Sequence, residues 1–194
     1  APTVLSAKAK ALGVSLFERL LKDHGDGVKA LLKEQHRFPT ALMEFPSVMT
    51  YGGQLRAHPS VADARLEGVP PFLFIDTAGK GFDESTGEGS ASLRNEGEAE
   101  LILERARALQ LPPSELGIIT PYRAQAELIR ERLANDEIEV DTVDAFQGRE
   151  KTAILLSLVR SNVEQKLGFL EDLRRINVAL TRAKHRCVVV WGSV

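Results

Sequence analysis

The chain is 194 residues long, 43% hydrophobic and 27% charged, with a formal net charge of -2 at pH 7. This composition is typical of a soluble globular protein with one core, and the near-neutral charge excludes a uniformly basic coat for nucleic acid. A local basic strip stays possible, because steering depends on where charges lie. No apolar run approaches the roughly 20 residues of a membrane-spanning helix, so we expect no membrane partner.

Cysteine and histidine are sparse. Cys187 lies in the apolar run 187–191 and is expected to be a buried strand thiol. One cysteine cannot form an internal disulfide, which favours a reducing, intracellular (cytoplasmic) compartment. The four histidines, at positions 24, 36, 58 and 185, show no ligand spacing, so the sequence predicts no metal site.

The first 60 residues predict short helices. Residues 15–21 place three leucines on one helical face, and the glycines after them end this helix. Residues 28–33 predict another helical turn, and Pro39 is expected to begin the next helix. Residues 51–54 (Tyr-Gly-Gly-Gln) predict a turn.

From residue 70 the pattern alternates between strands and helices. Apolar runs predict strands over 72–76, 117–120, 138–140, 152–159 and 187–191, and helices over 95–109, 123–133 and 173–183. Asn95 and Glu98 resemble a helix-capping pair, and the glycine- and acid-rich residues 77–93 predict a mobile loop. Strands separated by helices of this length predict an α/β fold with a mainly parallel sheet.

Three polar loops come directly after strands of this sheet, at residues 120–125, 142–150 and 160–162. Ligands of parallel sheets gather at the carboxyl ends of the strands. Hydroxyls, amides and backbone N–H groups there could hold phosphates without reading a base sequence. For the first loop the alternative is that Thr120 and Pro121 merely cap the next helix.

The helix predicted after Asp172 carries a row of arginines. Arg175, Arg182 and Arg186 share one face with the small residue Ala179, and a planar guanidinium suits phosphate oxygens. The alternative is a solvated basic face, or salt bridges to the acidic segment 83–104. The spacing leaves both interpretations open.

Two segments resemble motifs V and VI of superfamily 1 helicases: residues 141–150 (Asp-Thr-Val-Asp-Ala-Phe-Gln-Gly-Arg-Glu) and residues 174–184 (Arg-Arg-Ile-Asn-Val-Ala-Leu-Thr-Arg-Ala-Lys). The resemblance is to the 5′-to-3′, Upf1-like branch, which includes the nonsense-mediated-decay helicase and immunoglobulin mu-binding protein 2. Other segments resemble further elements of this branch in the expected order: 35–38 its Gln-Tyr-Arg-Met element, 45–55 the stretch after that element, 120–125 its motif IV, and 159–162 a later element.

This resemblance implies a RecA-like fold of the P-loop NTPase type, with three α/β/α layers. Residues 69–194 would be the second, C-terminal RecA-like motor domain, and residues 1–68 a helical lead-in from the first motor domain. The chain has no Gly-x-x-x-x-Gly-Lys-Ser/Thr (Walker A) sequence and no acidic pair for Mg²⁺. The family carries these in the first motor domain, which would hold most of the ATP and Mg²⁺, so the isolated chain is expected to be inactive.

The resemblance also implies roles for individual residues. Arg37 and Arg182 would contact the γ-phosphate of ATP, with Arg182 as the arginine finger. The nucleotide set is completed by Gln147, Gly148 and Glu150, of which Gln147 and Glu150 would couple nucleotide to nucleic acid. The nucleic-acid set is Thr120, Tyr122, Thr142, Ser161 and Asn162. His36 and Phe38 depart from the family's usual Tyr and Met, which changes stacking near the nucleotide but keeps the arginine.

The function implied is the C-terminal half of an ATP-dependent DNA or RNA helicase, working with the first RecA-like domain on a single strand. One alternative is the helicase part of a helicase–nuclease fusion. Another is a RecA-like interaction module that no longer hydrolyses ATP, although the presence of both Arg37 and Arg182 argues against it.

Overall fold

The computed structural model describes residues 14–86, 91–133, 137–162 and 166–192. Contacts divide the chain into two compact units, residues 1–33 and residues 34–194. Residues 34–68, predicted as part of the lead-in, therefore lie in the same unit as the sheet. The assignment of residues 1–68 to another motor domain stays a prediction.

The first unit contains helix α1 (Leu16–His24), which confirms the helix predicted over 15–21. A reciprocal cap begins it: the Ser15 hydroxyl accepts the Glu18 N–H at 3.1 Å, and the Glu18 carboxylate accepts the Ser15 N–H at 2.8 Å. A 3₁₀ turn, η2 (Gly25–Val28), comes next. The helical turn predicted over 28–33 is wrong, because so short a stretch cannot meet the cost of helix nucleation without packing.

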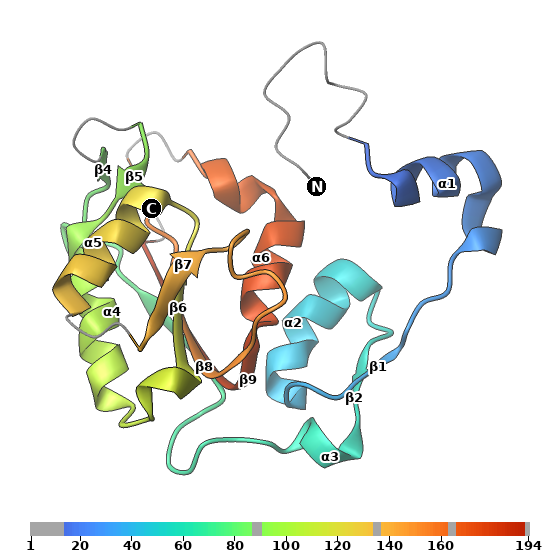
Figure 1. The fold of residues 1–194 in the computed structure, drawn as a ribbon, viewed down its shortest axis with the longest axis horizontal. Helices are drawn as coiled ribbons and strands as arrows, with labels where there is room; N and C mark the ends of the chain where they lie inside the picture. The colour runs from blue at the N-terminus through green and yellow to red at the C-terminus, as the bar shows by residue number, and fades with distance from the viewer. Residues whose placement is uncertain (1–13, 87–90, 134–136, 163–165, 193–194) are drawn as a thin grey trace. The chain divides into compact units, whose positions relative to one another are not determined.

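The second unit is built on a five-stranded sheet in the order β3-β9-β8-β6-β7, with all neighbours parallel (Figure 1). The strands are β3 (Phe72–Asp76), β6 (Leu116–Thr120), β7 (Glu139–Thr142), β8 (Lys151–Ser157) and β9 (Ala183–Trp191). The α/β class and the parallel sheet are confirmed. Strand β8 is central and buried over Ala153–Ser157, as expected of a strand covered on both faces.

Helices cover both faces of this sheet and make the predicted three layers (Figure 1). On one face lie α4 (Glu96–Ala108) and α5 (Arg123–Leu133); on the other lie α2 (Thr40–Tyr51) and α6 (Leu173–Leu180). Ala153 and Leu155 pack toward the first pair, whereas Ile154 and Leu156 pack toward the second. No helix in the described ranges is both long and apolar enough to span a bilayer.

Short elements complete the unit. Two small sheets pair β1 (Glu34–Gln35) with β2 (Arg56–Ala57) in parallel and β4 (Ser85–Thr86) with β5 (Leu93–Arg94) in antiparallel fashion. The remaining turns are α3 (Pro59–Ala62), η3 (Pro113–Glu115) and η4 (Gly168–Glu171). The loop predicted over 77–93 therefore contains strand residues, and its residues 87–90 lie outside the described ranges.

The helix predicted over 173–183 is too long. It ends at Leu180, where the Thr181 hydroxyl donates to Asn177 O at 2.8 Å, and strand β9 begins at Ala183 opposite Lys151. The prediction that Arg175, Arg182 and Arg186 share one helical face is therefore wrong, because only Arg175 lies on the helix. Arg182 lies in the turn between α6 and β9, and Arg186 lies within β9.

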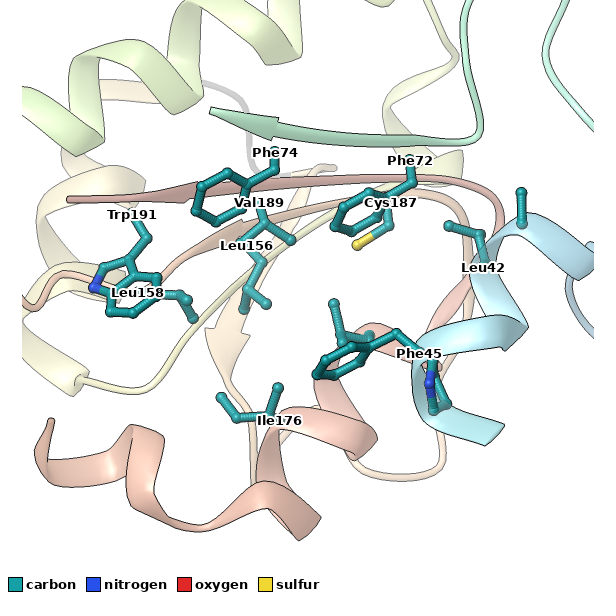
Figure 2. A pocket seen from close by; sticks show the side chains of 13 residues that line it. Leu42, Phe45, Phe72, Phe74, Leu156, Leu158, Ile176, Cys187, Val189 and Trp191 are labelled. Atoms are coloured by element: carbon teal, nitrogen blue, oxygen red, sulfur yellow. The ribbon is translucent and has the colours of Figure 1, made fainter. Parts of the chain in front are cut away.

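Strand β3 is an edge strand, and the burial that its apolar run (Phe-Leu-Phe-Ile) would predict is wrong in part. Phe72 and Phe74 are exposed, because α2 and α6 leave the outer part of their face of the sheet open. Both rings line an apolar recess of about 310 Å³, together with Phe45 of α2, Ile176 of α6 and Trp191 of β9 (Figure 2). Cys187 also lines it as the buried strand thiol that was predicted.

Candidate nucleotide and nucleic-acid site

Four charged residues of the predicted nucleotide region meet at the amino-terminal ends of β8 and β9. Glu150 precedes β8, and its carboxylate pairs with Arg37 Nε at 2.6 Å and with Lys184 Nζ at 2.8 Å. Arg37 also donates to Thr181 O at 3.2 Å, beside Arg182. The structure therefore brings together Arg37, Glu150 and Arg182, which were predicted to share one site although the first and last are far apart in sequence.

Gln35 holds Arg37 in place, a role that the sequence prediction missed. Its side-chain oxygen accepts the N–H groups of Arg37 at 2.8 Å and Phe38 at 3.0 Å, and its amide donates to Phe38 O at 2.7 Å. Phe38 is buried in the core, which anchors the same short segment. The only signal in the sequence was that Gln35 belongs to the family element that also contains the arginine.

Arg182 is a half-buried cation with neutral oxygens as its hydrogen-bond partners. It donates to Val178 O at 2.9 Å, to the Thr181 hydroxyl at 3.2 Å and to Arg149 O at 3.4 Å. Burial, and then repulsion from Arg37, lower the pKa of its guanidinium. An anion placed between Arg37 and Arg182 would remove this repulsion, so the arrangement favours a phosphate group.

Glu150 stays ionised between its two basic partners. The hydrogen bond from Lys184, assisted by Arg37, lowers the pKa of this carboxyl against the opposing effect of burial. In this structure Glu150 supplies the negative charge that pairs with Arg37. A bound polyphosphate would compete with Glu150 for the same guanidinium.

The segment 143–150 crosses from the carboxyl end of β7 to the amino end of β8. Val143 and Phe146 are buried and hold it on the sheet, and the Phe146 N–H donates to Thr142 O at 2.9 Å. Gln147 and Gly148 are exposed, and Gly148 has φ 89°, a conformation that side chains disfavour. One short segment thus connects the carboxyl ends of the strands with their amino ends.

The predicted nucleic-acid residues gather at the opposite, carboxyl edge. Thr120 and Thr142 are partners in register between β6 and β7. Thr120 is fully buried, and its hydroxyl accepts the Tyr122 N–H at 3.5 Å, so a direct contact to a ligand would require its exposure. The Tyr122 hydroxyl lies against Gly168, where an added Cβ would approach it to 3.1 Å.

Glu84 organises the loop that carries Ser161 and Asn162, a role that sequence reasoning missed. Its carboxylate accepts the Ser161 N–H at 3.0 Å and the Asn162 side-chain amide at 3.3 Å, and it pairs with Arg160 at 2.9 Å. The acidic segment 83–104 was noticed only as a possible partner of the arginines after residue 173. An acid at this edge positions the loop rather than attracting phosphate.

Among the described ion pairs, Arg174 and Arg175 pair with acids outside segment 83–104. Arg174 pairs with Asp172 at 3.1 Å, and Arg175 lies 3.5 Å from Asp144. Arg186 is buried and donates to the Pro70 carbonyl. The basic residues predicted on one helix are therefore divided between α6, the turn after it and β9, and Arg174 and Arg175 are paired with acids.

The predicted site residues divide between the two edges of the sheet. Thr120, Thr142 and the loop 160–162 lie at the carboxyl ends of strands, where ligand groups were expected, whereas Arg37, Glu150 and Arg182 lie at the amino ends of β8 and β9. The fold is a RecA-like α/β domain, with Arg37 and Arg182 converging at one edge of the sheet and a separate polar edge opposite.

Comparison with known proteins supplies the family. A family model described as "AAA domain" matches residues 12–193. "DNA-binding protein SMUBP-2" of Mesocricetus auratus is 42% identical over 209 aligned residues, which cover 99% of this chain and 21% of that protein. The "DNA polymerase alpha-associated DNA helicase A" of Saccharomyces cerevisiae is 39% identical, covering 92% of this chain and 30% of its own length. The "Regulator of nonsense transcripts 1 homolog" of Neurospora crassa is 37% identical, over 97% of this chain and 19% of its own length.

The chain therefore belongs to this AAA-domain family, among the Upf1-like superfamily 1 helicases. It spans about a fifth to a third of the length of these relatives. Among solved structures, the C-terminal domain of a possible DNA helicase from Lactobacillus aligns over 81% of this chain and 88% of that chain, with 11% identity and a TM-score of 0.49.

Proposed function

We propose that this chain is the second RecA-like domain of an ATP-dependent nucleic-acid helicase, with Arg182 as its arginine finger. The observation that carries the proposal is the convergence of Arg37 and Arg182 beside Glu150. Two guanidinium groups that repel one another fit the oxygens of a nucleotide phosphate. Relatives named as helicases, all longer than this chain, support a larger parent with a further motor domain.

ATP would supply the phosphoryl group whose transfer to water releases the free energy for movement. Arg182 would stabilise the negative charge that develops on that phosphoryl group. Arg37 would break its ion pair with Glu150 and contact the same group. Gln147, Gly148 and Glu150 would line the same side. Most of the ATP and its Mg²⁺ would be held by the first motor domain, because this chain has no Walker A sequence.

Coupling to nucleic acid would run through residues 143–150. This segment starts beside Thr142 at the nucleic-acid edge and ends at Glu150 in the nucleotide cluster. A change in the pairing of Glu150 would therefore reach Gln147 and the edge that holds Tyr122, Ser161 and Asn162. We propose single-stranded DNA or RNA as the partner, gripped at its backbone.

Replacement of Arg182 by alanine in the parent helicase tests this proposal. We expect nucleic-acid-stimulated ATP hydrolysis to fall about 10³-fold or more, because an arginine finger contributes on the order of 10³ to 10⁵ in turnover. Affinity for single strands, measured by fluorescence anisotropy at fixed salt, should change little.

The matched control is Arg174→Ala, which removes an exposed arginine of α6 that pairs with Asp172. This variant should keep near-normal turnover. If Arg182→Ala hydrolysed ATP as fast as Arg174→Ala, the arginine-finger assignment would be wrong. A helicase–nuclease fusion would show the same loss of ATP hydrolysis in Arg182→Ala, and the rest of the parent sequence would distinguish it. A non-hydrolysing module would show no ATP hydrolysis even in the unmodified parent.

A further inference from the structure

Three potential metal ligands, two in or directly after β1 and one from the distant residue after β2, meet at the small β1–β2 sheet. In its parallel register Gln35 lies opposite Ala57, and the His58 N–H donates to Gln35 O at 2.9 Å. Glu34 and His36 alternate along the chain, so they project from the same side. The next position in register places His36 beside His58, and their rings stack with centroids 4.2 Å apart and an interplanar angle of 25°.

The distances suit one small cation. One ligand atom from each of Glu34, His36 and His58 lies within 4.8 Å of the other two, and His36 Nε2 is 3.4 Å from a Glu34 oxygen. Zinc bonds of about 2.0–2.2 Å place the ligands of a tetrahedral ion roughly 3.3 Å apart. One pair already has this separation, and a modest side-chain rotation would bring in the third ligand.

Ser60 supplies the outer contact that a metal-binding histidine requires. His58 Nδ1 lies 2.8 Å from the Ser60 hydroxyl and 3.2 Å from the Ser60 backbone nitrogen. In this structure Nδ1 accepts the Ser60 N–H, which leaves Nε2 facing away from Ser60. With a metal on Nε2, Nδ1 would carry the proton, give up the Ser60 N–H and donate to the Ser60 hydroxyl, which would orient the ring.

The geometry points to a Zn²⁺-binding site formed by Glu34, His36 and His58, with a fourth position open to water. Two imidazoles and one carboxylate form a ligand set that selects zinc and similar borderline metals over Mg²⁺. His36 and Glu34 are more than half exposed, so the ion would exchange with solvent. This site does not depend on the proposed helicase function and differs from the expectation that no metal binds.

Metal binding would constrain the segment that carries Arg37. His36 directly precedes Arg37, and Gln35 of the same segment holds the Arg37 N–H. An ion bridging β1 to His58 would therefore reduce the freedom of residues 34–38. The immediate and measurable consequence is binding itself, without reference to nucleotide.

The test is titration of the tag-free chain with Co²⁺ and Zn²⁺. We expect one Co²⁺ per chain with the visible absorption of a four-coordinate site, displaced by Zn²⁺ and not by excess Mg²⁺. Calorimetry would give the zinc affinity. His36→Ala and Glu34→Gln should each weaken it at least about tenfold, and Ser60→Ala should weaken it by a comparable or smaller factor, because outer contacts are typically worth 10- to 100-fold.

His24→Ala is the matched control, since it removes an exposed histidine from the other compact unit. It should bind zinc like the unmodified chain. His58 also caps α3, so His36→Ala and Glu34→Gln carry the test, with far-UV circular dichroism to show that they fold. The proposal is overturned if zinc fails to bind, if His36→Ala binds it with unchanged affinity, or if His24→Ala loses as much.

Discussion

At the level of single residues, Glu98 is a buried carboxyl group with a raised pKa. It is fully buried at the carboxyl end of β8, where its Oε2 accepts the Ser157 hydroxyl at 2.6 Å and the Val159 N–H at 2.9 Å. Its Oε1 has no hydrogen-bond partner among the described residues. Burial raises the pKa of this carboxyl to about 7, against the opposing effect of hydrogen bonds from Ser157, Val159 and Leu158.

The sequence predicted a different role for Glu98. The pattern of Asn95 and Glu98 suggested a reciprocal cap, and Asn95 does accept the Glu98 N–H at 3.0 Å. The carboxylate does not return to Asn95, because it joins β8 instead. Gln125 links the same network, since its amide donates to Asn95 O and to the Ser157 hydroxyl, each at 3.0 Å. This network supports the backbone that leads to Ser161 and Asn162.

The raised pKa of Glu98 predicts a pH-dependent stability. A folded carboxyl that binds its proton more tightly than the unfolded one stabilises the fold below the ordinary pKa of 4.5, and this stability is lost as the pH rises to about 7. The loss should be about 3 kcal/mol. Urea unfolding at pH 5 and pH 8 should show this loss in the unmodified chain and not in Glu98→Gln. Equal pH dependence in both proteins would contradict the assignment.

Among the elements, segment 143–150 depends on a close approach in the core. Phe146 packs over β6 at Gly117, where an added Cβ would lie 2.8 Å from Phe146 Cζ and 2.9 Å from Ile154 Cδ1. Real Cβ atoms do not approach ring and methyl carbons so closely, so Gly117 is required for packing rather than for its backbone conformation. The turn that contains Gln147 and Gly148 therefore takes its position from a glycine on another strand.

Gly117→Ala should lower the free energy of unfolding by about 1–3 kcal/mol, the usual effect of overpacking a core. Denaturant unfolding measures this change. Gly27→Ala provides the comparison, because its added Cβ would meet nothing within 4 Å, and it should change stability by less than about 0.5 kcal/mol. Similar effects of the two substitutions would exclude the close approach of Phe146 as the cause.

For the molecule as a whole, we propose that the edge with Arg37 and Arg182 is one side of a nucleotide site. It offers Arg37 and Arg182, but the chain has no phosphate-cradling loop. The purified chain should therefore hydrolyse ATP negligibly and bind it weakly, with or without single-stranded nucleic acid. A phosphate-release assay checks this prediction, with the parent helicase as positive control. Stimulated turnover that persists in the pure chain and disappears in Arg182→Ala would contradict it.

Much of the fold was predictable because strand and helix patterns are local. The five strands of the main sheet and helices α4 and α5 are indicated by apolar runs and capping residues, and the parallel sheet is indicated by their alternation. The end of α6 was not predictable, because the residues from 181 to 184 are all compatible with a helix. The strand starts at Ala183 only because this residue pairs with Lys151 of β8. The exposure of Phe72 and Phe74 also depends on strand order, which local pattern does not contain.

The order of residues along the chain was enough to establish which family it resembles and which side chains could meet phosphate, because motifs are read directly from neighbouring positions. Which of these side chains lie in contact depends on the tertiary structure. Packing brought Arg37 to Arg182, placed Glu84 against Ser161, and stacked His36 on His58 where spacing had suggested no metal. Strand order and register set the distances between residues far apart in sequence, and such distances are properties of packing rather than of local pattern.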